Sequence, residues 1–78
     1  MQVSYDPRYN IAYIKLKEKQ EEVETIRLSE SVNIDLSPDG SVFGIELLNA
    51  NEQLGLLTGE NITFLNEAEG KKIVLDLS

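Results

Sequence analysis

The acidic and hydroxyl residues of "DLSPDGSVFGIE", residues 35–46, have the spacing of a calcium-binding loop. Asp35, Ser37 and Asp39 lie two residues apart, Gly40 takes the sixth place and Glu46 the twelfth. In an EF-hand these places supply oxygen ligands, a sharp turn and a closing carboxylate. The stretch therefore raises two hypotheses, a Ca²⁺ site or a turn between two strands.

The residues around this stretch favour the turn. An EF-hand loop lies between two amphipathic helices, whereas apolar and polar residues alternate here with the period of a strand on both sides. Pro38 restricts the backbone inside the supposed loop, and Phe43 takes the ninth place, where a polar residue is expected. On a strand, Glu46 would lie about 20 Å from Gly40, too far to close a cage. We therefore expect no metal. The weaker alternative is a metal site formed by Asp35, Ser37, Asp39 and Glu46. A small hydrolytic or metal-dependent site would use Asp6, Asp35, Asp39 and Glu46.

The first predicted turn, in "YDPRYN", carries a second polar pair and lies among three tyrosines. Asp-Pro initiates turns and asparagine tolerates the left-handed region, so Asp6 and Asn10 are interpreted as turn formers rather than as ligands. Tyr5 and Tyr13 are expected to face each other across a hairpin. Tyr9, at the turn itself, is predicted to be exposed and available for contact.

Glu46 is a carboxylate in the middle of an apolar strand. Such a group is solvated, paired with a cation or part of a functional groove, and we favour an ion pair with Lys15 or Arg27 across the sheet. Hydrolysis by paired carboxylates needs a cleft, which so small a sheet hardly offers. Because histidine and cysteine are absent and no phosphate loop is found, we expect neither enzymatic activity nor a cofactor. Tyr9, Tyr13 and Glu46 remain as candidates for contact with a partner.

Alternating apolar residues predict a series of short strands. The first two, in residues 1–5 and 11–16, should form a hairpin, and the second is apolar on both faces, as in a central or covered strand. Residues 17–24 are charged and should form an exposed loop. A bend or bulge is expected at "SES", residues 29–31. Further on, "SPDG" has the proline and glycine of a turn that leads into "SVFGIELL".

A short helix is predicted over residues 49–55, directly after this strand. Asn49 is a good N-cap, Glu52 lies three residues later as in a capping box, and Gly55 suits the C-terminal cap. Two more strands, residues 61–67 and 71–78, are expected on either side of "AEG". The sequence thus predicts an α+β fold, a small and mainly antiparallel sheet of hairpins with one short helix after "GIELLNA".

Length and charge limit the class of protein. The 78 residues make a single domain, with a sheet over residues 1–50 and a short helix and C-terminal strands over residues 51–78. The net charge of −7 makes nucleic acid and anionic membranes poor partners and a small basic protein a better one. No apolar run has the length of a membrane span and no signal-peptide pattern is present, so we expect a cytoplasmic protein.

The stretches "VSYDPRYNIAYIKL" and "VNIDLSPDGSVFGIELLNA" together form a pair of motifs. They resemble a family of small prokaryotic domains of unknown function, number 2283 in its series, whose members carry patterns like YDPxxDxLYIxL and GVxLDYDxDGxLxGIEILxAS. The residues that match are Tyr5, Asp6, Pro7, Tyr13, Ile14 and Leu16 in the first pattern and Asp35, Asp39, Gly40, Gly44, Ile45, Glu46, Leu48 and Ala50 in the second.

The resemblance covers about residues 1–50 and has three departures. Asn10 stands where the family usually has aspartate, and Asn33 and Asn49 are polar variants. It implies a small antiparallel sheet with a short helix and brings no established activity. Some members occur beside small toxin-like proteins, which implies an antitoxin-like or partner-binding role.

We therefore expect a non-catalytic protein-interaction module that forms a homodimer or binds a small basic protein. The two apolar faces of residues 11–16 indicate that one face of the sheet meets another layer. That layer would be the C-terminal segment or a second copy of the chain.

Overall fold

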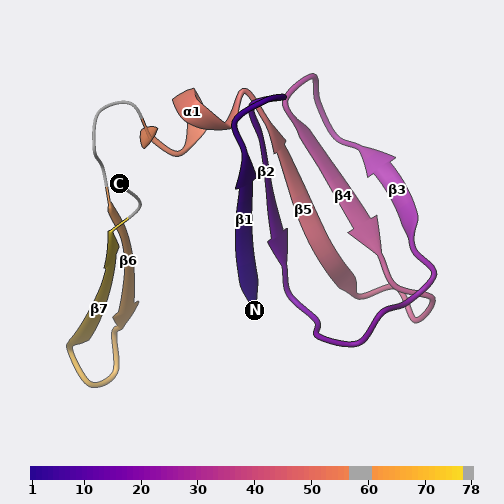
Figure 1. Cartoon of the computed structure of the whole chain (residues 1–78). Helices are drawn as coiled ribbons and strands as arrows, with labels where there is room; N and C mark the ends of the chain where they lie inside the picture. Colours follow the sequence, from indigo (N-terminus) through magenta and orange to yellow (C-terminus); the bar gives the residue numbers. More distant parts are fainter. Residues whose placement is uncertain (57–60, 77–78) are drawn as a thin grey trace.

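Five strands form one antiparallel sheet in the computed structural model, which describes residues 1–56 and 61–76 (Figure 1). Across the sheet the order is β1 (Gln2–Asp6), β2 (Ile11–Lys15), β5 (Val42–Leu48), β4 (Val32–Leu36) and β3 (Glu24–Arg27). Neighbours in sequence form the hairpins β1–β2, β3–β4 and β4–β5, whereas β5 returns to pair with β2. The strand that carries Glu46 is therefore the central one.

The turn at "SPDG" is the predicted hairpin connection. The Gly40 N–H donates to the Ser37 carbonyl at 2.9 Å, and the Ser37 N–H donates to the Ser41 carbonyl at 2.8 Å. Gly40 has φ +87°, so the loop has three residues and ends on a left-handed glycine. The first turn has the predicted left-handed asparagine, Asn10, with φ +56°.

The bend predicted at "SES" is a complete reversal of the chain. The N–H groups of Leu28 and Ser29 both donate to the Val32 carbonyl, at 3.0 and 3.2 Å. Residues 24–27 and 32–36 are therefore antiparallel partners, rather than two parts of one bent strand. The charged connector before them is the predicted loop, and Lys17 holds it to the next turn by donating from Nζ to Ser37 Oγ at 3.0 Å.

The short helix α1 (Ala50–Gln53) forms at the predicted place, but its predicted cap was wrong. Asn49 has φ +53°, and its side chain makes no capping hydrogen bond. Asn10 supplies the cap instead, because its Oδ1 accepts the Asn51 N–H at 2.8 Å. Gly55, with φ +64°, ends the helix as expected. No helix in residues 1–56 or 61–76 has the length and apolar character needed to cross a membrane.

The last two predicted strands are present as a separate hairpin, β6 (Asn61–Asn66) and β7 (Lys71–Asp76). Figure 1 shows this hairpin beyond α1, set off from the five-stranded sheet. Gly70, with φ +68°, closes its turn by donating to the Asn66 carbonyl at 2.8 Å. Residues 77–78, the predicted end of the last strand, lie outside the described residues. The observed fold is the predicted small α+β arrangement of antiparallel strands with one short helix.

The main sheet is a single layer with two different faces. Side chains of paired residues point to the same side, so the register places five aliphatic residues in one row across all five strands. That row consists of Val3, Ile14, Ile45, Ile34 and Ile26. A parallel row on the opposite face is polar and consists of Ser4, Tyr13, Glu46, Asn33 and Arg27.

Candidate functional site

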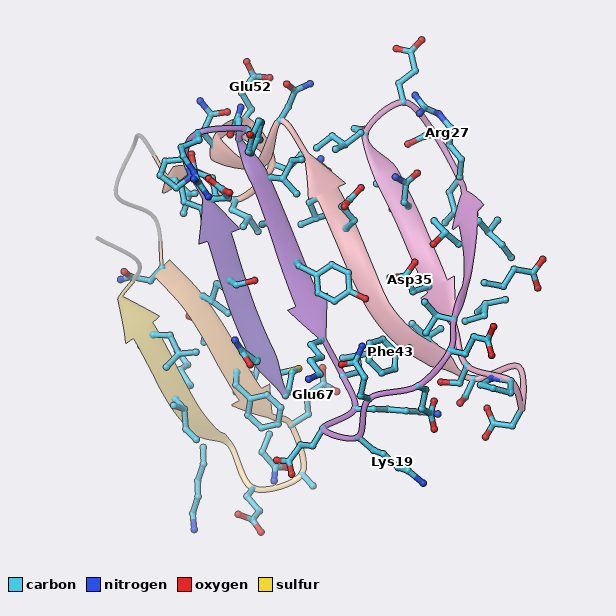
Figure 2. All side chains as sticks on the ribbon, turned by 45° about the vertical axis from the view of Figure 1, so that its right-hand side comes forward. Lys19, Arg27, Asp35, Phe43, Glu52 and Glu67 are labelled. Carbon is cyan, nitrogen blue, oxygen red and sulfur yellow. The ribbon has the colours of Figure 1, made fainter. Side chains whose placement is uncertain are left out.

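Tyr13, on β2, lies at the centre of the polar face. Its hydroxyl donates to Asp35 Oδ2 on β4 at 2.6 Å, although β5 lies between the two strands. Thr25, from the edge strand β3, donates to the other oxygen of the same carboxylate at 2.5 Å. Figure 2 shows Asp35 on the face that is turned toward the reader. One carboxylate thus joins side chains from three strands.

Gly44 makes this contact possible. A Cβ at position 44 would lie 2.7 Å from Cε1 and 2.5 Å from Cζ of the Tyr13 ring, well inside van der Waals contact. The bare glycine backbone of β5 therefore lets the ring lie over the strand and reach Asp35. A glycine in a strand interior marks such a close approach.

The electrostatics of the Tyr13 hydroxyl suit a hydrogen-bond donor. Burial raises its pKa to about 12, and the hydrogen bond to Asp35 and the negative charges of Asp35 and Glu46 act in the same direction. The phenol is protonated at neutral pH, and its single proton is already directed at Asp35. The Tyr13 hydroxyl therefore joins β2 to β4 as a donor, and near pH 7 it does not act as a base.

Glu46 does not form the predicted ion pair. Its partner across β4 is Asn33, whose Nδ2 donates to Glu46 Oε1 at 2.9 Å. Lys15 is paired in register with Gly44, and Arg27 with Asn33, so neither cation lies directly opposite the carboxylate. No ion pair within 4.0 Å joins Glu46 to either one. The Asn33 Oδ1 atom is buried and accepts no hydrogen bond.

The residues with calcium-loop spacing are distributed along two strands and a turn. Asp35 lies on β4 and Glu46 on β5, while Asp39 lies in the turn and bonds the backbone and side chain of Ser41. These bonds lower the pKa of Asp39, and the charge of Lys17 adds to the effect. Ser37 is buried and faces Lys17. Within the described ranges no three carboxylates, histidines or cysteines are grouped as a metal site.

Asp6 and Asn10 have the predicted roles in the first turn. Asp6 Oδ1 accepts the Arg8 N–H at 2.9 Å, which closes an Asx-turn, and the Arg8 guanidinium completes a pair with Oδ2 at 3.0 Å. The bonds from the Arg8 side chain and backbone lower the pKa of Asp6. Asn10 also reaches α1, since its Nδ2 donates to Asn51 Oδ1 at 2.6 Å. This connection across the molecule was not predicted.

The tyrosines are arranged differently from the prediction. Tyr5 pairs with Ala12, and Ser4 pairs with Tyr13, so Tyr5 and Tyr13 lie on opposite faces of the hairpin. A four-residue turn sets this register, and a shift of one residue reverses the face of every side chain. Tyr9 is exposed as expected, at 71% of its surface, with the Arg8 guanidinium 5.7 Å from its ring centre.

The opposite, apolar face is a second candidate for the functional surface. Its extent across all five strands could not be recognised from single residues in the sequence. The aliphatic row from Val3 to Ile26 runs across the whole sheet, and Tyr5, Ala12, Leu47 and Val32 form a second row beside it. Ile14, Ile45 and Ile34 lie on inner strands and are nevertheless only half-buried. Each strand showed the alternation in sequence, but only the strand order shows that the rows align.

One comparison with known proteins places the chain in a family. The family described as Protein of unknown function (DUF2283) matches residues 2–51, which is most of the chain. The chain belongs to this family. The DUF2283 match runs from β1 into α1 and so contains the whole five-stranded sheet, both of its faces and the Tyr13–Gly44–Asp35 contact. The resemblance seen in the sequence is thereby confirmed, with the β6–β7 hairpin outside the matched range.

Neither the curated proteins nor the solved structures give a significant match to the chain. The description of the DUF2283 family names no activity.

Proposed function

We propose that this protein is a non-catalytic protein-interaction module and that the apolar face of its five-stranded sheet is the contact surface. The observation that carries the proposal is the exposure of this face. Val3 and Ile26, at its two edges, are each 39% exposed. A continuous apolar surface of this kind typically marks a site of protein association.

The chemistry of the polar face supports a binding role over a catalytic one. Asp35 accepts two hydrogen bonds and Glu46 accepts one, so both carboxylates are engaged within the sheet. The Tyr13 proton is directed at Asp35, and these groups lie on the broad face of a sheet. Such a network stiffens the strands that present the apolar face behind it.

The charge of the chain favours a small basic protein as a heterologous partner. With a net charge of −7, the protein attracts a cationic partner over a longer range than the apolar contacts act. An antitoxin-like role, in which the module covers a small basic protein, agrees with this charge and with the apolar face. The apolar face would supply affinity, and the acidic surroundings would accelerate association.

The proposal is tested by affinity capture of the protein from its native host with one matched pair of variants. Val3→Lys places a charge on the apolar face, whereas Ser4→Lys places the same charge next to it on the polar face. Both positions are exposed and lie on β1, so the two variants should fold equally well, which ¹⁵N–¹H spectra would check. We expect one small basic protein to be retained by the wild type and by Ser4→Lys, and to be lost at least tenfold with Val3→Lys. Equal retention by all three would contradict the proposal, and so would a wild type that retains no protein and is also a monomer.

A further inference from the structure

We infer that the apolar face of the sheet is covered by a second copy of this chain, so that two five-stranded sheets pack face to face in a symmetric dimer. This inference rests on the proposed function, since it uses the same apolar face as the contact surface; a basic protein would bind there by displacing the second copy. It is carried by the exposed area of the chain, by the distribution of charge over the two faces and by the width of the sheet.

The exposed area is larger than is typical of a free monomer of this mass, and the exposed β6–β7 hairpin contributes to it together with the apolar face of the sheet. The chain of 8.8 kDa exposes 5946 Å², whereas a folded monomer of that mass typically exposes about 4,800 Å². The excess, roughly 1,100 Å², exceeds the area of about 800 Å² that each partner buries in a standard stable interface.

The distribution of charge lets two acidic copies meet on this face. Among the paired residues of β1–β5 on the apolar side, Glu24 is the one charged residue, and it lies at the edge in β3. The charged residues Asp6, Lys15, Asp35, Glu46 and Arg27 lie on the other side. Face-to-face packing therefore brings aliphatic rows together and leaves the carboxylates in water.

The width of the sheet argues against the chain's own β6–β7 hairpin as the cover. Two strands span about 10 Å, whereas five strands span about 24 Å, so one hairpin would leave more than half of the face in water. The hairpin also leaves its own hydrophobic side chains exposed, with Phe64 and Ile73 each at 61%. A layer of equal width is a second five-stranded sheet, and an isologous pair uses the same face twice.

The packing predicts which residues meet. Aligned sheets pack about 10 Å apart with interdigitated side chains. Because β5 is the central strand, Ile45 should lie closest to the two-fold axis. Val3 and Ile26, at opposite edges of the sheet, should lie at opposite ends of the interface.

The first test is sedimentation velocity over a dilution series with two matched pairs of variants. Val3→Lys and Ile26→Glu place a charge on the apolar face, and their neighbours Ser4→Lys and Arg27→Glu place the same charge on the polar face. We expect the wild type and both polar-face variants to sediment as dimers, and each apolar-face variant to dissociate at protein concentrations at least tenfold higher. A wild type that is a monomer at 100 μM, roughly a weak-association limit, would overturn the inference.

The second test locates the interface. In a mixed sample of labelled and unlabelled chains, a filtered NOE experiment should show contacts between chains among the methyl groups of Ile14, Ile34 and Ile45. Contacts between chains that involve only polar-face residues or strand edges would overturn the inference, as would contacts within one chain from Phe64 or Ile73 to these methyl groups. If the wild type is a monomer and captures a basic protein that Val3→Lys does not capture, the dimer is refuted and the proposed function stands. A monomer that captures nothing would refute both.

Discussion

The hydroxyl of Tyr13 donates to Asp35 at 2.6 Å by reaching over the backbone of Gly44, so the aromatic ring covers the glycine of the strand between them. The contact links β2, β5 and β4 on the polar face. It predicts that these residues act as one energetic unit in the sheet.

Substitution of Gly44 should therefore destabilise the protein through Tyr13. Gly44→Ala would displace the ring and break its bond to Asp35, and we expect a loss of about 1–2 kcal/mol in the free energy of unfolding. In a Tyr13→Ala background the same substitution should cost less than about 0.5 kcal/mol, because the added methyl group then meets no ring. Urea denaturation of the four proteins measures this coupling. Equal costs in the two backgrounds would show that the glycine has another role.

The raised pKa of Tyr13 predicts a loss of stability at high pH. The folded-state value of about 12 lies above the ordinary value of 10.0, so the folded state holds the proton more tightly than the unfolded state. This contribution is complete below pH 10 and is lost as the pH rises toward 12. Denaturation of the wild type and of Tyr13→Phe over this range should show a steeper decline for the wild type. Parallel curves would contradict the prediction.

Asn10 should stabilise the contact between the first turn and α1. Its side chain accepts from and donates to Asn51, and its φ of +56° disfavours most other residues. We expect Asn10→Ala to cost about 1–2 kcal/mol in the free energy of unfolding and Asn10→Gly to cost less, because glycine restores the backbone angle but not the bonds. Asn10→Asp should cost least, because it keeps the acceptor and the Asn51 amide can rotate to donate. Thermal denaturation gives this order, and a costlier aspartate than alanine would contradict it.

Ca²⁺ should not bind to residues 35–46, the stretch with the spacing of a calcium-binding loop. Asp35 and Glu46 already accept hydrogen bonds within the sheet, and Asp39 bonds Ser41 in the turn. Addition of millimolar CaCl₂ to ¹⁵N-labelled protein is expected to shift the amide signals of residues 35–46 no more than NaCl of equal ionic strength does. A saturable shift confined to these residues would restore the metal-site hypothesis.

Part of the candidate site was predictable because it depends on neighbours in sequence. Asp6 accepts the N–H of Arg8, two residues away, and the N–H of Gly40 donates to the carbonyl of Ser37, three residues away. The partner of Glu46 was not predictable, because the choice between Asn33 and a cation depends on the register of β4 and β5. The cap of α1 was missed for the same reason, since it comes from Asn10, 41 residues before Asn51.

The sequence by itself determined the strands, the turns at "DPRYN" and "SPDG", the short helix and the family. Hydrophobic alternation and the Asp-Pro and Pro-Asp-Gly turns act over a few residues and leave clear patterns. Only the tertiary structure decided that β5 lies between β2 and β4, and this order aligns the aliphatic rows and places Tyr13 beside Asp35. The physical reason is that a strand's pattern shows which of its residues share a face. Which strands lie beside it, and in which register, is decided by pairing between distant segments.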